Sequence, residues 1–124
     1  MRWIVDGMNV IGSRPDGWWR DRRRAMAALV ERLEQWALPD KVDVTVVFEQ
    51  PPSPPIESAV VTVAHAPAPA PNSADDEIVR MVRTDANPER IRVATSDRAL
   101  SERVRSAGAT VYPAERLRDL IDPR

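Results

Sequence analysis

Apolar positions along the chain fall into two kinds of segment, short runs typical of buried strands and longer segments with helical spacing. Residues 3–5 form a short apolar run, and in residues 20–38 apolar side chains recur at intervals of three and four. Such spacing places them on one face of a helix, so a strand followed by an amphipathic helix is predicted. The apolar positions of this helix are Met26, Leu29, Val30, Leu33 and Trp36.

The same alternation continues to the end of the chain. Residues 42–48 (VDVTVVF) and 59–63 (AVVTV) are rich in Val and Thr, which is typical of strands. The segment SADDEIVRMVRTD has the apolar side of a short helix and is expected to begin after an N-cap at Asn72 or Ser73. The remaining predicted elements are a strand at 91–94, a helix at 98–107 ended by Gly108, a strand at 110–112 and a helix at 114–121.

Alternating strands and helices predict an α/β fold with three layers. Parallel neighbours need long crossovers, which helices supply, so we expect a mostly parallel central sheet of about five strands with helices on both faces. The Pro-rich segments QPPSPP and APAPAPNS are predicted to be loops within one domain spanning residues 1–124. The first of them links the second and third strands through only about ten residues without helical pattern, which leaves the direction of the third strand open.

Composition narrows the possible chemistry. The chain has no Cys, which excludes thiolate catalysis, zinc–thiolate sites and disulfides and agrees with an expected cytoplasmic location. No apolar run approaches the ~18 residues of a membrane span, and the start MRWIVDG lacks the features of a signal peptide. Net charge is −1, yet Lys41 is the only Lys among 18 basic residues. Arg binds phosphate with a planar fork, so a near-neutral total can conceal a basic face.

Acidic residues follow the predicted strands. In doubly wound sheets ligands bind outside the carboxyl ends of the strands, where strand order reverses. Crowded carboxylates repel one another, and bound Mg²⁺ or Mn²⁺ is the usual reason to keep several ionised in one cleft. Such an ion can polarise a phosphate and activate water, so the predicted reaction is phosphodiester hydrolysis. The five acids expected at this edge are Asp6, Glu49, Asp75, Asp76 and Asp97.

Each of these motifs also has an ordinary structural explanation. Asp6 with the following glycine is common turn chemistry, Ser96 or Asp97 is a good N-cap, and Ser73 with Asp76 resembles a capping box. Caps, however, should occur at both edges of a sheet and do not require acids. Because these acids are all expected at one edge, a metal site is the favoured interpretation.

The chain resembles the PIN-like NYN domains, specifically their short YacP-like branch. The resemblance rests on the runs DGMNVIGS, VFEQ, SADDEIV and ATSDRA, which occur in the family's order over nearly the whole chain. It implies a PIN-like α/β fold, Mg²⁺ or Mn²⁺ as cofactor, and endoribonuclease activity on cellular RNA.

The resemblance also assigns residues. It implies that Asp6, Asp75 and Asp97 bind the metal, that Asn9 steadies the first acid, and that Ser96 stands beside the last. Asp76, next to Asp75, is a further candidate ligand. Where the family usually has Asp after the second strand, this chain has Glu49, which is therefore predicted to support the site from outside the ligand set.

RNA contacts are predicted from arginines near the acids and from a cluster around two tryptophans. Arg14 and Arg98 lie close to the acids in sequence, whereas Arg22 and Arg23 follow Trp18 and Trp19, whose rings could stack on bases. The same cluster could instead be a solvated helix face with the tryptophans packed at its start. His65 is expected to be a bystander.

Competing families lack required residues. A receiver domain needs a Lys where Tyr112 and Pro113 stand, and the first turn has no G-x-G-x-x-G spacing for a dinucleotide. The open alternative is a catalytically silent PIN-like module that binds RNA or protein, favoured by Glu49 and by the missing C-terminal helical region of longer family members. Single-stranded or structured RNA is the expected partner; a ribosome or protein partner, and a monomer or homodimer, stay open.

Overall fold

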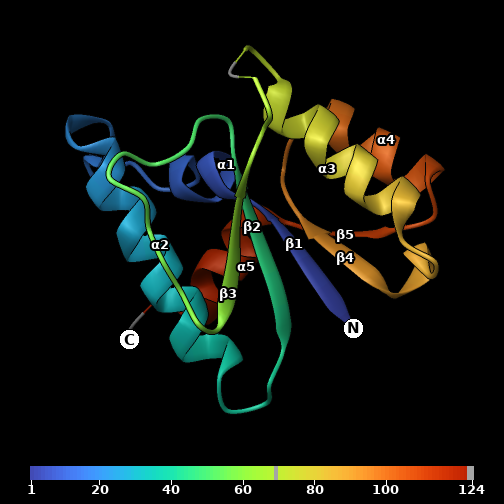
Figure 1. Cartoon of the computed structure of the whole chain (residues 1–124), viewed down its shortest axis with the longest axis horizontal. Helices are drawn as coiled ribbons and strands as arrows, with labels where there is room; N and C mark the ends of the chain where they lie inside the picture. Colours follow the sequence, from blue (N-terminus) through green and yellow to red (C-terminus); the bar gives the residue numbers. More distant parts are fainter. Residues whose placement is uncertain (69, 123–124) are drawn as a thin grey trace.

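The computed structural model describes residues 1–68 and 70–122, which contain one five-stranded, all-parallel sheet (Figure 1). The strands follow the order β3-β2-β1-β4-β5, so the chain first builds outward on one side of β1 and then on the other. This order reverses between β1 and β4. The strands are β1 Arg2–Asp6, β2 Asp43–Phe48, β3 Val61–His65, β4 Ile91–Ala94 and β5 Thr110–Tyr112.

Helices cover both faces of the sheet, which confirms the predicted three-layer α/β architecture. One face carries α1 (Gly7–Gly12), α2 (Arg22–Ala37) and α5 (Ala114–Ile121). The other carries α3 (Ser73–Thr84) and α4 (Arg98–Ser106), drawn at the right of Figure 1. Two short 3₁₀ turns precede α2 and β4, at Trp18–Arg20 and Pro88–Arg90. Among the described residues, none of these helices has the length and apolar character needed to cross a bilayer.

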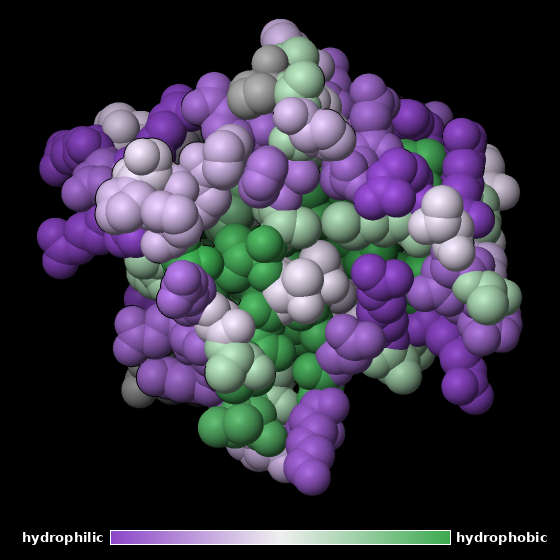
Figure 2. Space-filling view, viewed as in Figure 1, coloured by the Kyte–Doolittle hydropathy of each residue, from purple (hydrophilic) through white to green (hydrophobic). Residues whose placement is uncertain are grey.

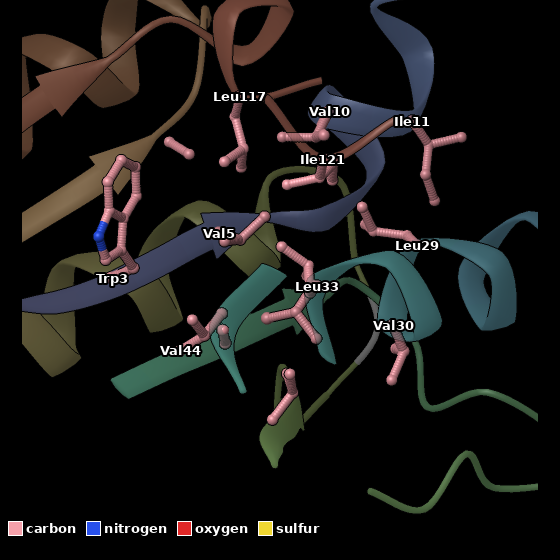
Figure 3. Close-up of a cluster of buried hydrophobic side chains, with 14 of the residues drawn as sticks. Trp3, Val5, Val10, Ile11, Leu29, Val30, Leu33, Val44, Leu117 and Ile121 are labelled. Atoms are coloured by element: carbon pink, nitrogen blue, oxygen red, sulfur yellow. The ribbon is translucent and has the colours of Figure 1, made fainter. Parts of the chain in front are cut away.

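Strand residues alternate between two cores. Trp3 and Val5 of β1 pack toward α2 and α5, whereas Ile4 between them packs toward α3 and α4. Figure 3 shows the first core, in which side chains of α1, α2 and α5 meet those of β1 and β2. Since both faces are buried, the strands are apolar along most of their length, as expected for a parallel sheet.

The third strand is parallel, which settles the direction that the sequence left open. The link 49–60 crosses over α2 without a helix, and α2 holds it in place. Arg23 donates to the carbonyls of Pro54 and Pro55, at 3.2 and 3.4 Å, and the Ser58 hydroxyl donates to Glu34 at 2.8 Å. β3 forms an edge of the sheet. Figure 2 shows the molecule from the same side as Figure 1, and on this side apolar side chains gather near the middle with polar ones around them.

The predicted strand at 59–63 was placed two residues too early. The Ser58 hydroxyl accepts hydrogen bonds from the backbone N–H groups of Val60 and Val61, at 3.1 and 2.9 Å. These contacts hold the chain in a turn, so that β3 begins only at Val61.

The helix α1 was missed from the sequence, where Asp6 and Gly7 were interpreted as common turn chemistry. It starts directly after β1 and depends on Gly7. A Cβ added to Gly7 would lie 2.5 Å from Cε1 of Phe48, at the end of β2. Only glycine therefore allows α1 to begin this close to the sheet.

We expect Gly7→Ala to lower the free energy of unfolding by roughly 1–3 kcal/mol, as overpacking of a core does. Gly12→Ala is the matched control within the same helix, since its Cβ would meet nothing closer than 3.9 Å, at Cζ2 of Trp18. Urea denaturation of both variants measures the difference. Equal stability of the two would show that Phe48 moves aside freely.

Candidate active site

A pocket of about 270 Å³ opens at the carboxyl edge of the sheet, where the ends of β1 and β2 meet the starts of α3 and α4. The pocket also includes Asp97, which follows β4, so it reaches the boundary between β1 and β4 where strand order reverses, the usual location of ligand sites in such folds. We call it the acidic pocket. It is lined by Asp6, Met8, Asn9, Val47, Glu49, Asn72, Ala74, Asp75 and Asp97.

Asp6 is buried at the end of β1 and accepts a hydrogen bond of 2.8 Å from the Thr95 hydroxyl. Sheet register explains this contact. Ile4 pairs with Val93, so the residues two positions later on each strand face the same side of the sheet next to each other. Burial raises the pKa of Asp6 from 3.8 to about 7. The Thr95 hydrogen bond opposes this rise, and the charges of Asp75 and Asp97 add to it.

Asp97 both caps α4 and lines the acidic pocket. One carboxylate oxygen accepts from the N–H of Leu100 at 2.8 Å, as an N-cap does, and the Asp97 N–H donates to the Thr95 hydroxyl at 3.1 Å. The predicted capping role is therefore confirmed. It does not exclude a role in the pocket, since the second carboxylate oxygen is not used by the cap.

Asp75 and Asp76 diverge, although both open α3. Asp75 is half-buried in the pocket, and burial together with the charge of Asp97 raises its pKa. The Asp76 side chain is 73% exposed and accepts from Arg103 at 2.9 Å, outside the pocket. Successive helix residues point about 100° apart, and here the Asp75 side chain points into the pocket while that of Asp76 points toward Arg103. The expected convergence of five acids is thus reduced to four, with Asp76 excluded.

The capping box predicted at the start of α3 is not formed. Asn72 is the N-cap residue, as one of the two predicted alternatives had it, but its side chain makes no capping hydrogen bond. The Ser73 hydroxyl instead accepts from the N–H of Ala70 at 3.2 Å. This contact stabilises the turn that leads into α3.

Asn9 and Ser96 tie three elements together beside the acids. The Asn9 side-chain oxygen accepts from the Ser96 N–H at 2.8 Å, which joins α1 to the loop after β4. The Ser96 hydroxyl donates to Glu115 at 3.1 Å and accepts from the N–H of Ala114 at 2.9 Å, which joins the same loop to α5. The backbone of Asn9 also hydrogen-bonds to Asp6 and lowers the pKa of that carboxyl against the effect of burial.

Arg14 and Arg98, expected near the acids, do not line the acidic pocket. Arg14 forms ion pairs with Asp119 and Asp122 near the end of α5. The Arg98 side chain is 94% exposed and faces Glu102 at 3.7 Å. Closeness in sequence to an acid did not bring either guanidinium into the site.

The other sequence candidates lie around the pocket or away from it. Glu49, half-buried after β2, lines the acidic pocket, whereas Arg22 and Arg23 line a second pocket that adjoins it. His65 is exposed, and its ring nitrogen contacts the carbonyl of Ala66.

Two residues that organise the site were missed from the sequence. One is Thr95. It could have been identified because it comes two residues after Val93 and therefore faces the same side of the sheet as Asp6. The other is Arg118, 7% exposed, which donates to the carbonyls of Val10 and Ile11 at 3.3 and 3.1 Å. These hydrogen bonds pair carbonyl groups in the last turn of α1 that have no partner within the helix. The sequence could have indicated this role, because Arg118 occurs at a position of the predicted last helix where its spacing from the apolar residues predicts burial.

The four acids surround the pocket without meeting at one point. Within residues 1–68 and 70–122, no three His, Asp or Glu side chains are already arranged to hold a metal ion. No Arg or Lys lines the pocket in the part of the chain described. The negative charge of the pocket is therefore offset by basic residues outside it. Arg103 is one of these, and its charge lowers the pKa of Asp75.

The raised pKa of Asp6 predicts how stability depends on pH without divalent ions. The folded protein holds this proton up to pH of about 7, whereas the unfolded chain releases it near 3.8. The free energy of unfolding should therefore fall across this interval, by an amount on the order of a few kcal/mol. Asp6→Asn removes the effect, so the stability of the variant relative to wild type should rise from pH 4 to pH 7. Urea titrations in EDTA measure it, and a flat difference curve would contradict the assignment.

Comparisons with known proteins agree on one family. The family described as "YacP-like NYN domain" matches residues 3–123. A mutant of Rae1 (YacP) from Bacillus subtilis has a crystal structure with a TM-score of 0.78 and 25% identity, covering 97% of this chain and 75% of that one. The non-mutant structure gives a TM-score of 0.79 and 23% identity, covering 97% and 73%. No curated protein matches the sequence significantly.

Proposed function

The chain belongs to the YacP-like NYN domain family of PIN-like nucleases, and on this premise we propose that it is a metal-dependent endoribonuclease whose active site is the acidic pocket. One observation carries the proposal beyond the family. Carboxylates from four separate segments line a single pocket at the switch point of the sheet, with no basic side chain among the residues described there. A structural role for these acids would not require them to share a pocket.

The residues of the pocket fit a hard divalent cation. Asp6, Asp75 and Asp97 would hold Mg²⁺ or Mn²⁺, and Glu49 stands at the rim in a supporting position. Among the residues that the structure describes, three carboxylate ligands are not preassembled. This suits Mg²⁺, which keeps several of its waters and often uses only one or two carboxylates. Burial is the main cause of the raised pKa values of Asp6 and Asp75, and repulsion from neighbouring carboxylates adds to it. A bound cation would offset this repulsion.

Hydrolysis adds water across a P–O bond, leaving one phosphate monoester and one hydroxyl. The cation, when bound, supplies Lewis acidity to the scissile phosphate and acidifies the attacking water. The protein's part is orientation. Thr95 holds one oxygen of Asp6, and the N–H of Leu100 holds one oxygen of Asp97, so that each acid offers its second oxygen in a defined direction.

The competing function is a silent PIN-like module that binds RNA without cutting it. The absence of three preassembled ligands among the described residues favours it, as does Glu49 in place of the family's usual Asp. The two functions differ in one measurable property, cleavage that requires a divalent ion.

We expect RNA cleavage in Mg²⁺ or Mn²⁺ that stops in excess EDTA and is lost in Asp97→Asn. Asn is as good an N-cap as Asp, so this variant should keep α4 and the fold while removing a ligand charge. Asp76→Asn is the matched control, since it removes a charge from the adjacent rim but not from the pocket. A labelled single-stranded RNA resolved on gels measures cleavage, and thermal melting checks the fold.

Two outcomes would overturn the proposal. Full cleavage in excess chelator would exclude the metal mechanism. RNA binding without cleavage in either metal would leave the silent module as the function.

A further inference from the structure

A second pocket, of about 260 Å³, adjoins the acidic pocket and has a different character. We call it the side pocket. It lies between the first turns of α2 and the loop after β2, and Met8 and Glu49 line both pockets. Its apolar side is lined by Met8, which is half-buried, with the buried side chains of Met26 and Phe48 behind it, whereas Arg22, Arg23 and Gln50 make it polar. The two pockets are therefore contiguous, one acidic and the other apolar and basic.

We propose that the side pocket binds the base of the nucleotide next to the scissile phosphate, with Arg22 on the neighbouring phosphate. The proposal rests on the proposed function, because it takes the acidic pocket as the place of the scissile bond. A nucleobase has two apolar faces and a polar edge, which matches a pocket with apolar walls and few polar groups.

Charge complementarity selects an RNA strand as the occupant. Arg22 is exposed at the pocket, where its guanidinium lies 5.4 Å from the ring centroid of Trp18, and it belongs to none of the ion pairs among the described residues. A phosphate would supply the missing counter-charge. The strand would then run from a cation held by the acids to a guanidinium held by α2.

Arg23 has a different role from Arg22. It donates to the carbonyls of Pro54 and Pro55 and so holds the loop that forms the far wall of the side pocket. We regard it as a positioning residue. Pro52, buried in the same loop, also lines the side pocket.

Met8, which is only half-buried, makes the pocket tolerant of different bases. Unbranched thioether side chains adapt their shape to the group they contact. Stacking on a base is sequence-tolerant because every base presents the same kind of face. The side pocket should therefore favour an unpaired nucleotide of any sequence over one held in a duplex.

The test compares two arginines of one helix. Arg22→Ala removes a charge from the side pocket, whereas Arg24→Ala removes one from the same turn of α2 but outside it, since Arg24 lines a different pocket near Trp18. We expect Arg22→Ala to lower kcat/KM on single-stranded RNA about tenfold, as loss of one charged phosphate contact does, with little change in Arg24→Ala. The log–log salt slope of binding should flatten by about 0.7 in Arg22→Ala alone.

A second arm tests the base itself. RNA oligonucleotides with one abasic nucleotide, moved stepwise through the sequence, should lose cleavage at one position beside the scissile bond, roughly tenfold or more from lost stacking. The same RNA placed in a duplex should be a poorer substrate. Equal effects of the two arginine variants, or no sensitive position in the abasic series, would overturn the inference.

The inference and the proposed function fail separately. If RNA is bound but not cut, the endoribonuclease proposal falls, and fluorescence anisotropy of the same abasic oligonucleotides still tests the side pocket. If RNA is cut with metal but neither arm singles out Arg22 or one base, the active site stands and the side pocket is not its subsite.

Discussion

Backbone hydrogen bonds hold β1 between β2 and β4, and the geometry of the site depends on this central position. All carboxyl ends of a parallel sheet meet at one edge, so Asp6 comes to lie beside Val47 on one side and near Thr95 on the other. Apolar cores on both faces stabilise the sheet and at the same time bury Asp6. Burial that favours folding thus makes ionisation of one carboxyl costly. The packing that stabilises the fold thus also raises the cost of a charge on Asp6, and a bound cation would lower that cost.

The short helix α1 shows how distant parts of the chain share the task of positioning. A helix of six residues is not stable by itself, so tertiary contacts must hold it. Gly7 lets it approach Phe48 at its start, and Arg118 from α5 binds its last carbonyls. In between, Asn9 reaches Ser96. The orientation of the first acid is therefore coupled to the loop after β4 and to the last helix.

Charge is separated within a chain whose net charge is only −1. Four carboxylates line the acidic pocket, and two arginines line the side pocket next to it. Other arginines bind carboxylates within the fold, as Arg118 does with Asp16 and Arg14 with Asp122. Their charges stabilise contacts between elements and are not free for a ligand. Arginine content alone therefore says little about a nucleic-acid surface until each ion pair is known.

Local pattern in the sequence determined the type of every strand and of every α-helix except α1, the α/β class and the acids that follow the strands. Strands 91–94 and 110–112 and the helix 114–121 were predicted with the observed bounds. A strand buried on both faces appears as a short apolar run, and a helix buried on one face appears as apolar residues three and four positions apart. The resemblance to YacP-like NYN domains was likewise readable in short motifs and is confirmed. Tertiary structure alone decided strand order, the start of β3, the outward direction of Asp76, and the roles of Thr95 and Arg118. Each depends on contacts between distant parts of the chain, such as Asp6 and Thr95, which are 89 positions apart in the sequence. A periodic pattern shows which side of a helix or strand is buried. Which other residues contact that side depends on how the whole chain packs.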